Sequence, residues 1–215
     1  GSEMCIRDRC SPVMKKRVDL PEKKYEGYIF DLDGTLVDSM PLHYRAWREA
    51  LARAGAPDHV FRADEFYSCG GKSANDVVRF LNERYGMHMD AASTAADKRR
   101  IYLEMLEKEG MQPIREVVEF VHSLGDAPKA IATGSAMPGA SRTLAAAGLS
   151  GLFDVILTPD EVEHGKPAPD MFLKAAELLG VSPDRCVVFE DAEPGMKAAA
   201  AAGMDCVQVR RPSLA

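Results

Sequence analysis

Five short runs of apolar residues recur along the chain, and each has the length of a buried β-strand. They cover residues 28–32, 129–133, 154–158, 186–190 and 205–209. Continuous apolar runs of this length are typical of parallel strands that are covered on both faces. The pattern therefore predicts one parallel sheet built from all five runs.

The segments between these runs carry apolar residues at helical spacing and end at glycine. Gly125, Gly148 and Gly180 each follow such a segment, and Gly203 follows the alanine-rich run 198–202. Glycine just past a helix is the expected stop signal. Alternating strands and helices predict an α/β fold, a Rossmann-like sheet with helices on both faces and a ligand site beyond the carboxyl ends of the strands.

Residues 41–112 interrupt this alternation, because they show helical periodicity and no convincing strand. Ser39 is the candidate cap of a first helix that Gly55 ends, Ser73 opens a second with capping-box spacing, and a third covers about 92–109. The segment predicts an inserted, all-helical cap domain. The predicted divisions are a disordered tail at 1–24, a catalytic core at 25–40 and 113–215, and the cap at 41–112.

Composition narrows the partners that we expect. The 33 acidic residues outnumber the 27 basic ones, the net charge is −6, and no dense Lys/Arg stretch could track a nucleic acid backbone. The sequence contains no run of about 18 apolar residues, so it predicts no membrane span. The N-terminus also lacks the apolar stretch of a secretory signal. We expect a small-molecule ligand, no nucleic acid, no membrane and a monomer.

The five cysteines are odd in number and include no Cys-x-x-Cys pair. This count argues against a disulfide framework and against a zinc site, and it favours the reducing cytoplasm. Cys186 and Cys206 lie in apolar strand-like runs, where a free thiol usually acts as a small core residue. We propose neither as a nucleophile.

The first predicted strand delivers two aspartates, Asp31 and Asp33, at its carboxyl end. One carboxylate can attack phosphorus while the other moves a proton to the leaving oxygen and later from water. Gly34 permits a sharp turn, and Thr35 can hydrogen-bond a local carbonyl. A calcium loop and a surface turn are the alternatives for Asp-x-Asp-Gly, and the strand context and the missing remainder of the calcium loop exclude that loop.

Two further strand ends add donors and a cation. The second strand is followed by Thr133-Gly134-Ser135, whose hydroxyls and N–H groups suit a phosphoryl oxygen, although a capping role is the alternative. Lys166 lies in a loop that two prolines hold, where an ammonium can neutralise a nucleophile and a phosphate. A solvated lysine is the alternative there, and we interpret His164 as a surface residue.

The fourth strand ends in Glu190 and Asp191. Together with Asp31 they offer hard oxygen ligands that suit Mg²⁺. Three carboxylates that lie close together repel one another unless a cation binds them, whereas an exposed acidic turn is the alternative. The pattern predicts a magnesium site.

The ordered set of Asp31-x-Asp33-Gly-Thr, Thr133, Lys166-Pro-x-Pro-Asp and Glu190-Asp191 resembles the haloacid dehalogenase superfamily. The match covers residues 25–40 and 113–210. Asp38-Ser-Met-Pro-Leu-His43-Tyr-Arg-Ala-Trp47 makes the chain similar to the sugar-phosphate branch, which contains beta-phosphoglucomutase and the fructose-1-phosphate phosphatases.

The resemblance implies a role for each residue. Asp31 would take the phosphoryl group, Asp33 would shuttle the proton, and Thr133 and Lys166 would hold the phosphate. Mg²⁺ would be bound by Asp31, the Asp33 carbonyl and Asp191, with Glu190 a direct or water-bridged ligand. His43 and Trp47 lie four residues apart on one helix face, near the cap hinge in this family, although packed cap residues are the alternative.

The cap segment separates a phosphatase from a mutase. The lysine and the arginine that grip a second phosphate in the mutase align here with Gly70 and Ala74, while Lys72, Ser73 and Asn75 remain as polar substrate contacts. The resemblance therefore favours a phosphatase acting on a small phosphorylated metabolite, with a sugar-phosphate mutase as the alternative. A phosphoacceptor signalling domain and an inactive binding module are further alternatives, which steady turnover of phosphoesters would exclude.

Overall fold

The structure is a computed structural model that describes residues 16–70 and 72–210 of the chain. It contains a single five-stranded sheet in the order β3-β2-β1-β4-β5, and all neighbouring strands are parallel. The strands are β1 (Gly27–Phe30), β2 (Lys129–Ala132), β3 (Val155–Leu157), β4 (Cys186–Glu190) and β5 (Asp205–Gln208). The five predicted strands and their parallel arrangement are confirmed.

Helices follow the strands as the glycine positions predicted. Four of them belong to the sheet half of the molecule: α5 (Arg115–Ser123), α6 (Met137–Ala146), α7 (Asp170–Leu179) and α8 (Glu193–Ala201). Short 3₁₀ turns lie at Pro159–Glu161 and Pro183–Arg185. Gly180 ends α7 in the left-handed conformation, as expected for a helix stop.

The sheet is covered on both faces, and successive residues of β1 show how. Tyr28 and Phe30 belong to one core cluster with residues of α5 and α6, such as Val117 and Leu144. Ile29, between them, belongs to a second cluster with residues of α7 and α8. Because side chains alternate along a strand, a continuous apolar run fills both cores at once.

β5 departs from this expectation because it is an edge strand. Of its residues only Val207 is partly buried, while Asp205, Cys206 and Gln208 are exposed. The interpretation of Cys206 as a core residue is therefore wrong, whereas that of Cys186 is confirmed, since Cys186 is fully buried in β4.

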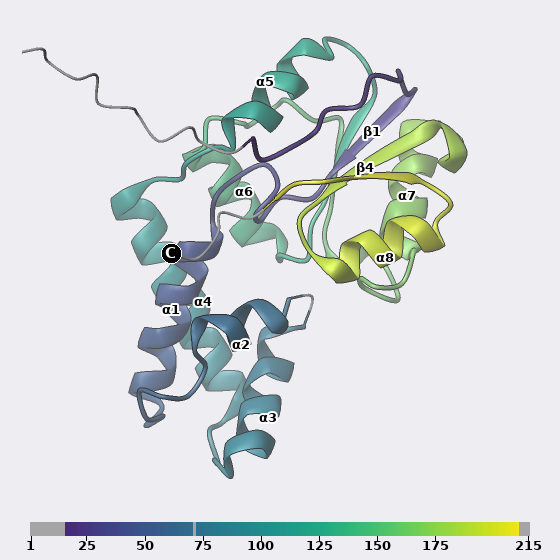
Figure 1. Cartoon of the computed structure of the whole chain (residues 1–215). Coiled ribbons are helices and arrows are strands. Elements are labelled where there is room, and N and C mark those ends of the chain that lie inside the picture. The colour runs from purple at the N-terminus through teal and green to yellow at the C-terminus, as the bar shows by residue number, and fades with distance from the viewer. Residues whose placement is uncertain (1–15, 71, 211–215) are drawn as a thin grey trace, which may run out of the picture.

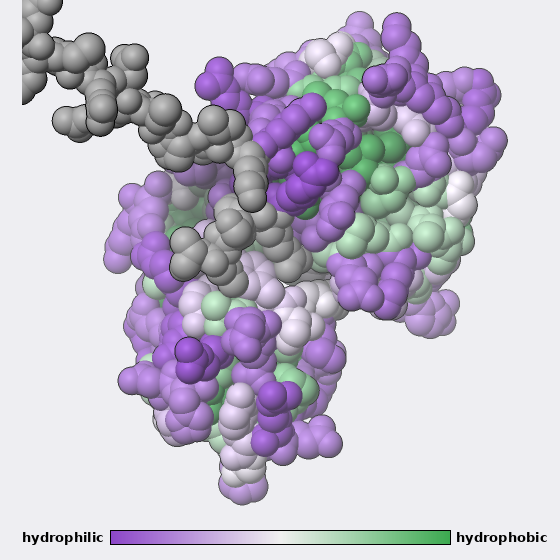
Figure 2. Space-filling view, in the orientation of Figure 1, coloured by the Kyte–Doolittle hydropathy of each residue, from purple (hydrophilic) through white to green (hydrophobic). Residues whose placement is uncertain are grey.

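The segment that interrupts the sheet folds into four helices, α1 (Met40–Arg53), α2 (Ala63–Ser68), α3 (Ala74–Tyr85) and α4 (Ala91–Glu109). They form a group beside the sheet half (Figure 1), and they have their own apolar core around Trp47, Phe61 and Leu81. Figure 2 shows the surface hollowed between the two halves. None of the helices in the described residues is both long and apolar enough to cross a bilayer. The boundary between cap and core stays a prediction.

The predicted N-terminal tail extends too far into the chain. Val18 is completely buried in the core and forms an antiparallel bridge with Val209, just past β5. Residues 1–15 lie outside the described part of the chain, so only residues 16–24 bear on the expectation. The sheet half therefore uses residues upstream of position 25.

Candidate active site

The two aspartates leave β1 in a tight turn that only glycine fits. The Asp31 N–H donates to the Phe189 carbonyl (3.0 Å) and continues the sheet, and Gly34 then adopts a φ of +94°. A Cβ on Gly34 would lie 2.4 Å from Oδ2 of Asp191. Glycine is required for the backbone angle and for the close approach of Asp191.

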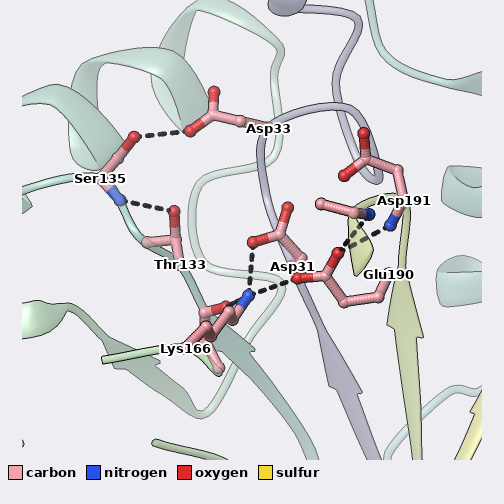
Figure 3. Close-up of polar contacts among 9 residues, drawn as sticks. Asp31, Asp33, Thr133, Ser135, Lys166, Glu190 and Asp191 are labelled. Atoms are coloured by element: carbon pink, nitrogen blue, oxygen red, sulfur yellow. Dashed lines mark hydrogen bonds and ion pairs between the residues drawn. The ribbon is translucent and has the colours of Figure 1, made fainter. Parts of the chain in front are cut away.

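Lys166 is the buried cation of the site. Its Nζ donates to Oδ1 of Asp31 (2.8 Å), to Oε1 of Glu190 (2.7 Å) and to the carbonyl of Ala132 (2.9 Å) (Figure 3). Burial opposes the charge of Lys166, but the two carboxylates outweigh it and raise the pKa of the ammonium. Lys166 is therefore a fixed positive charge against Asp31 and no solvated surface lysine.

Both carboxylate oxygens of Glu190 accept hydrogen bonds from neighbouring groups. Its Oε1 accepts from Lys166, and its Oε2 accepts the N–H groups of Asp191 and Ala192, both at 2.8 Å. A Cβ on Gly195, in α8, would lie 1.8 Å from Oε1 of Glu190. The side chain therefore occupies a space that Gly195 leaves open, and it anchors both Lys166 and the turn that carries Asp191.

Asp33 points away from Lys166 and toward Ser135 (Figure 3). A ring of donors, formed by Ser39, His43 and Ser135, surrounds its carboxylate. Its Oδ1 accepts from the Ser39 hydroxyl (2.6 Å) and faces Nε2 of His43 (3.2 Å), while its Oδ2 accepts from the Ser135 hydroxyl (2.6 Å). Burial alone would raise the pKa of Asp33, but His43 and the two hydroxyls outweigh it and lower that pKa. Ser39 occupies the N-cap position of α1, as the sequence predicted, but its hydroxyl makes no cap bond and donates to Asp33 instead.

The helical segment contributes a second layer behind Asp33. Lys98, on α4, lies with its Nζ 2.8 Å from Nδ1 of His43, and the His43 ring stacks on Tyr102 with centroids 4.1 Å apart. The Tyr102 hydroxyl hydrogen-bonds Thr143 of α6 at 2.9 Å. Trp47 is buried, edge-on to Phe61, with Lys98 Nζ 5.7 Å from its ring. His43 therefore touches the site directly, and Trp47 packs one layer further out.

The segment after β2 supplies the predicted hydroxyls. Thr133 is buried, and its Oγ1 accepts the Ser135 N–H at 3.0 Å, while Gly134 is exposed with no atom close to where a Cβ would be. This turn aims the Ser135 hydroxyl at Asp33. The Thr35 prediction is wrong: its buried Oγ1 finds no partner in the part of the chain that the structure describes.

The three polar cap residues are exposed and lie around the start of α3. The Ser73 hydroxyl accepts the Asp76 N–H and caps α3, as the spacing predicted, and Lys72 lies with its Nζ 5.7 Å from the Phe80 ring. Asn75 projects from the first turn of the helix. Their role as substrate contacts stays a prediction.

Three carboxylates gather at the carboxyl ends of β1 and β4. One oxygen each of Asp31, Glu190 and Asp191 lie within 4.8 Å of one another, and all three residues are buried. Burial raises the pKa of Asp31 well above its usual value, Lys166 opposes this rise, and Glu190 and Asp191 add to it. These three carboxylates offer only oxygen donors, and they carry more negative charge than the Lys166 ammonium can offset. Such a donor set fits Mg²⁺.

Several residues of the site carry no signal in the sequence. Lys98 and Tyr102 look like ordinary positions of a charged helix, and the fit of Gly195 against Glu190 depends on how α8 packs on β4. The link from Ser135 to Asp33 spans about a hundred residues, so only the strand order reveals it.

Known proteins provide an independent comparison. The family model described as haloacid dehalogenase-like hydrolase matches residues 25–203. The fructose-1-phosphate phosphatase YqaB of Escherichia coli is 39% identical over 87% of this chain and 98% of its own. A beta-phosphoglucomutase of Mycobacterium bovis is 35% identical over 87% of this chain and 81% of its own. CbbY from Rhodobacter sphaeroides, crystallised with phosphate, has a TM-score of 0.73 at 27% identity and covers 85% of this chain and 84% of its own.

Proposed function

Because the chain belongs to the haloacid dehalogenase-like hydrolase family, we propose that it hydrolyses a small sugar phosphate with Mg²⁺ through an aspartyl-phosphate intermediate. The observation that supports this most is the contrast between the two aspartates. Asp31 faces the ammonium of Lys166, while Asp33 faces the hydroxyls of Ser39 and Ser135. Adjacent carboxylates in such different surroundings can take different roles.

In the first half of the reaction, a carboxylate oxygen of Asp31 attacks phosphorus, and the bond from phosphorus to the ester oxygen breaks. Asp33 gives its proton to the leaving alkoxide. The anionic phosphoester favours this protonated form, since a like charge nearby raises the pKa of a carboxyl group. Lys166 and the donors around Thr133 hold the phosphoryl oxygens.

In the second half, water attacks phosphorus and Asp33 takes its proton. Inorganic phosphate leaves and the Asp31 carboxylate is restored. The ring of donors around Asp33 favours the carboxylate form, which suits this step. Asp31 and Asp191 would hold Mg²⁺, which when bound offsets the like charges of the carboxylates and the ester.

A mutase of the beta-phosphoglucomutase type is the second candidate, and the 35% identity to one such enzyme favours it. A mutase must grip a second phosphate in the cap while the first is transferred. Gly70 and Ala74 lack the side chains for that grip, and the ammonium of Lys98 is engaged by His43. The phosphatase relative is also the more similar of the two at 39% identity. We therefore propose hydrolysis.

A panel of hexose and pentose phosphates, assayed with magnesium for released phosphate and for isomerised product, tests the proposal. We expect phosphate release from at least one hexose monophosphate, with Asp31→Asn as the inactive control. Conversion of beta-glucose 1-phosphate to glucose 6-phosphate, primed by the bisphosphate and faster than phosphate release, would establish the mutase instead.

A further inference from the structure

We infer that Arg17 is a positioning residue that braces the junction between the sheet half and the helical segment; the inference rests on the proposed phosphatase reaction. Arg17 lies upstream of the residues that the family model matches. Its Nη1 lies 3.2 Å from Oδ2 of Asp38, and its Nε donates to the Arg210 carbonyl at 3.1 Å. Its backbone N–H donates to Oε1 of Glu116 at 3.3 Å.

These contacts reach both chain segments that join the two halves. The outgoing segment runs through Asp38 into α1, and the returning segment runs from α4 through Gln112 into α5, whose first turn holds Glu116. The two segments are tied together, because the Asp38 N–H donates to the Gln112 carbonyl at 2.9 Å and Val37 bridges Pro113. Arg17 thus contacts one residue on each side of the junction.

Asp38 directly precedes the residues that contact the Asp33 carboxylate. The next residue, Ser39, donates to Asp33, and α1 then carries His43 to the same carboxylate. A shift of Asp38 therefore moves two of the donors that orient Asp33. Positioning errors of this kind reduce the rate of the chemical step more than ground-state binding, because the core groups still hold the phosphate.

The ion pair between Arg17 and Asp38 is less exposed to solvent than a typical surface ion pair. The side chains of Arg17 and Asp38 are only 20% and 31% exposed, and Val18 beside Arg17 is completely buried. Lys23, on the same N-terminal segment as Arg17, pairs with Asp205 of β5. The two side chains are 63% and 57% exposed, and neither residue lies in a junction segment. Lys23→Ala is therefore a matched control, since it removes a cation from the same stretch.

The test compares Arg17→Ala, Asp38→Asn, the double variant and Lys23→Ala in the full chain. Trp47 is the single tryptophan and lies on α1 beside Lys98, so acrylamide quenching of its fluorescence reports the fit of α1 without any substrate. We expect Arg17→Ala to lower kcat about three- to tenfold with KM within about twofold, and to increase the quenching of Trp47. Asp38→Asn should do the same, and the double variant should be no worse than either single variant.

Equal kcat and equal quenching for Arg17→Ala and Lys23→Ala would overturn the inference, as would additive losses in the double variant. If Arg17→Ala fails to fold, Asp38→Asn against Lys23→Ala decides the same question. If no phosphoester is turned over by the wild-type protein, the proposed function fails, while the quenching of Trp47 still decides whether Arg17 braces the junction.

Discussion

The Nζ of Lys98 lies 2.8 Å from Nδ1 of His43, and this contact determines which ring nitrogen of His43 carries the proton. An ammonium can only donate, so Nδ1 accepts and the neutral ring is protonated at Nε2. Burial and then the charge of Lys98 lower the pKa of His43, which favours this neutral form. Nε2 can then donate to Asp33, so Lys98, on the helical segment, orients the Asp33 carboxylate through His43.

Replacing Lys98 should therefore slow the chemical step. Lys98→Met keeps the length of the side chain but removes the donor, so the His43 ring no longer has one fixed tautomer. We expect kcat to fall about ten- to a hundredfold with a smaller change in KM, which is part of what general acid–base catalysis contributes. Steady-state kinetics measures both parameters, and Arg99→Met, which replaces the exposed neighbouring arginine, is the control. A Lys98→Met enzyme that keeps half of the wild-type kcat would remove Lys98 from this role.

The pH profile should carry the signature of the same lysine. Burial lowers the pKa of Lys98 to about 8, with Asp33 opposing the shift and Arg99 adding to it. Lys98 is therefore protonated below this pH and loses its proton above it, so kcat should fall as the pH rises through about 8. The fall should be absent from the Lys98→Met profile. An identical alkaline limb in the two proteins would assign it to another group.

Glu190 and Asp191 should respond differently to magnesium. Asp191→Ala removes a carboxylate of the proposed magnesium site, so the magnesium concentration for half-maximal activity should rise more than about tenfold. Glu190→Gln should lower kcat, because Lys166 loses a charged partner, but should leave that concentration within about threefold. Magnesium titrations of activity measure both values. A shift as large for Glu190→Gln as for Asp191→Ala would make Glu190 a direct ligand.

Gly195 should be sensitive to a single added methyl group. In Gly195→Ala the Cβ would overlap Oε1 of Glu190, so the carboxylate must move and Lys166 with it. We expect a loss of about 1–3 kcal/mol in the free energy of unfolding, together with reduced activity. Gly139→Ala, in α6, has open space at the same atom and should be neutral or stabilising by up to about 1 kcal/mol. Denaturant unfolding of both variants measures these changes. Equal losses of unfolding free energy in Gly195→Ala and Gly139→Ala would show that the Cβ at position 195 does not clash with Glu190.

The fold could be predicted from the sequence because its strands are buried on both faces. Residues such as Tyr28, Ile29 and Phe30 are apolar in succession only where two cores must be filled, and glycine marks the helix ends. The same reasoning failed at β5, since an edge strand needs only one apolar face and Cys206 is exposed on it. Val18 escaped prediction because one buried residue in a charged stretch has no periodicity.

The first layer of the candidate site could also be predicted, because strand ends converge at one edge of a parallel sheet. That geometry brings Asp31 and Asp191 together, and the loop between β3 and α7 adds Lys166 from the same edge. The second layer could not, because it depends on packing between elements that are distant in sequence. Lys98 reaches His43 only through the way in which α4 packs on α1, and no spacing rule encodes such a contact.

The most direct test of the account is to trap the phosphorylated residue. The enzyme is mixed with magnesium and the best substrate of the phosphate-release panel, quenched in acid within one turnover, and reduced with borohydride, which converts an aspartyl phosphate to homoserine. Peptide mass spectrometry then locates the change. We predict homoserine at position 31 in the wild-type protein and none in Asp31→Asn. Homoserine at Asp33 or Asp191, or turnover with none at position 31, would contradict the account.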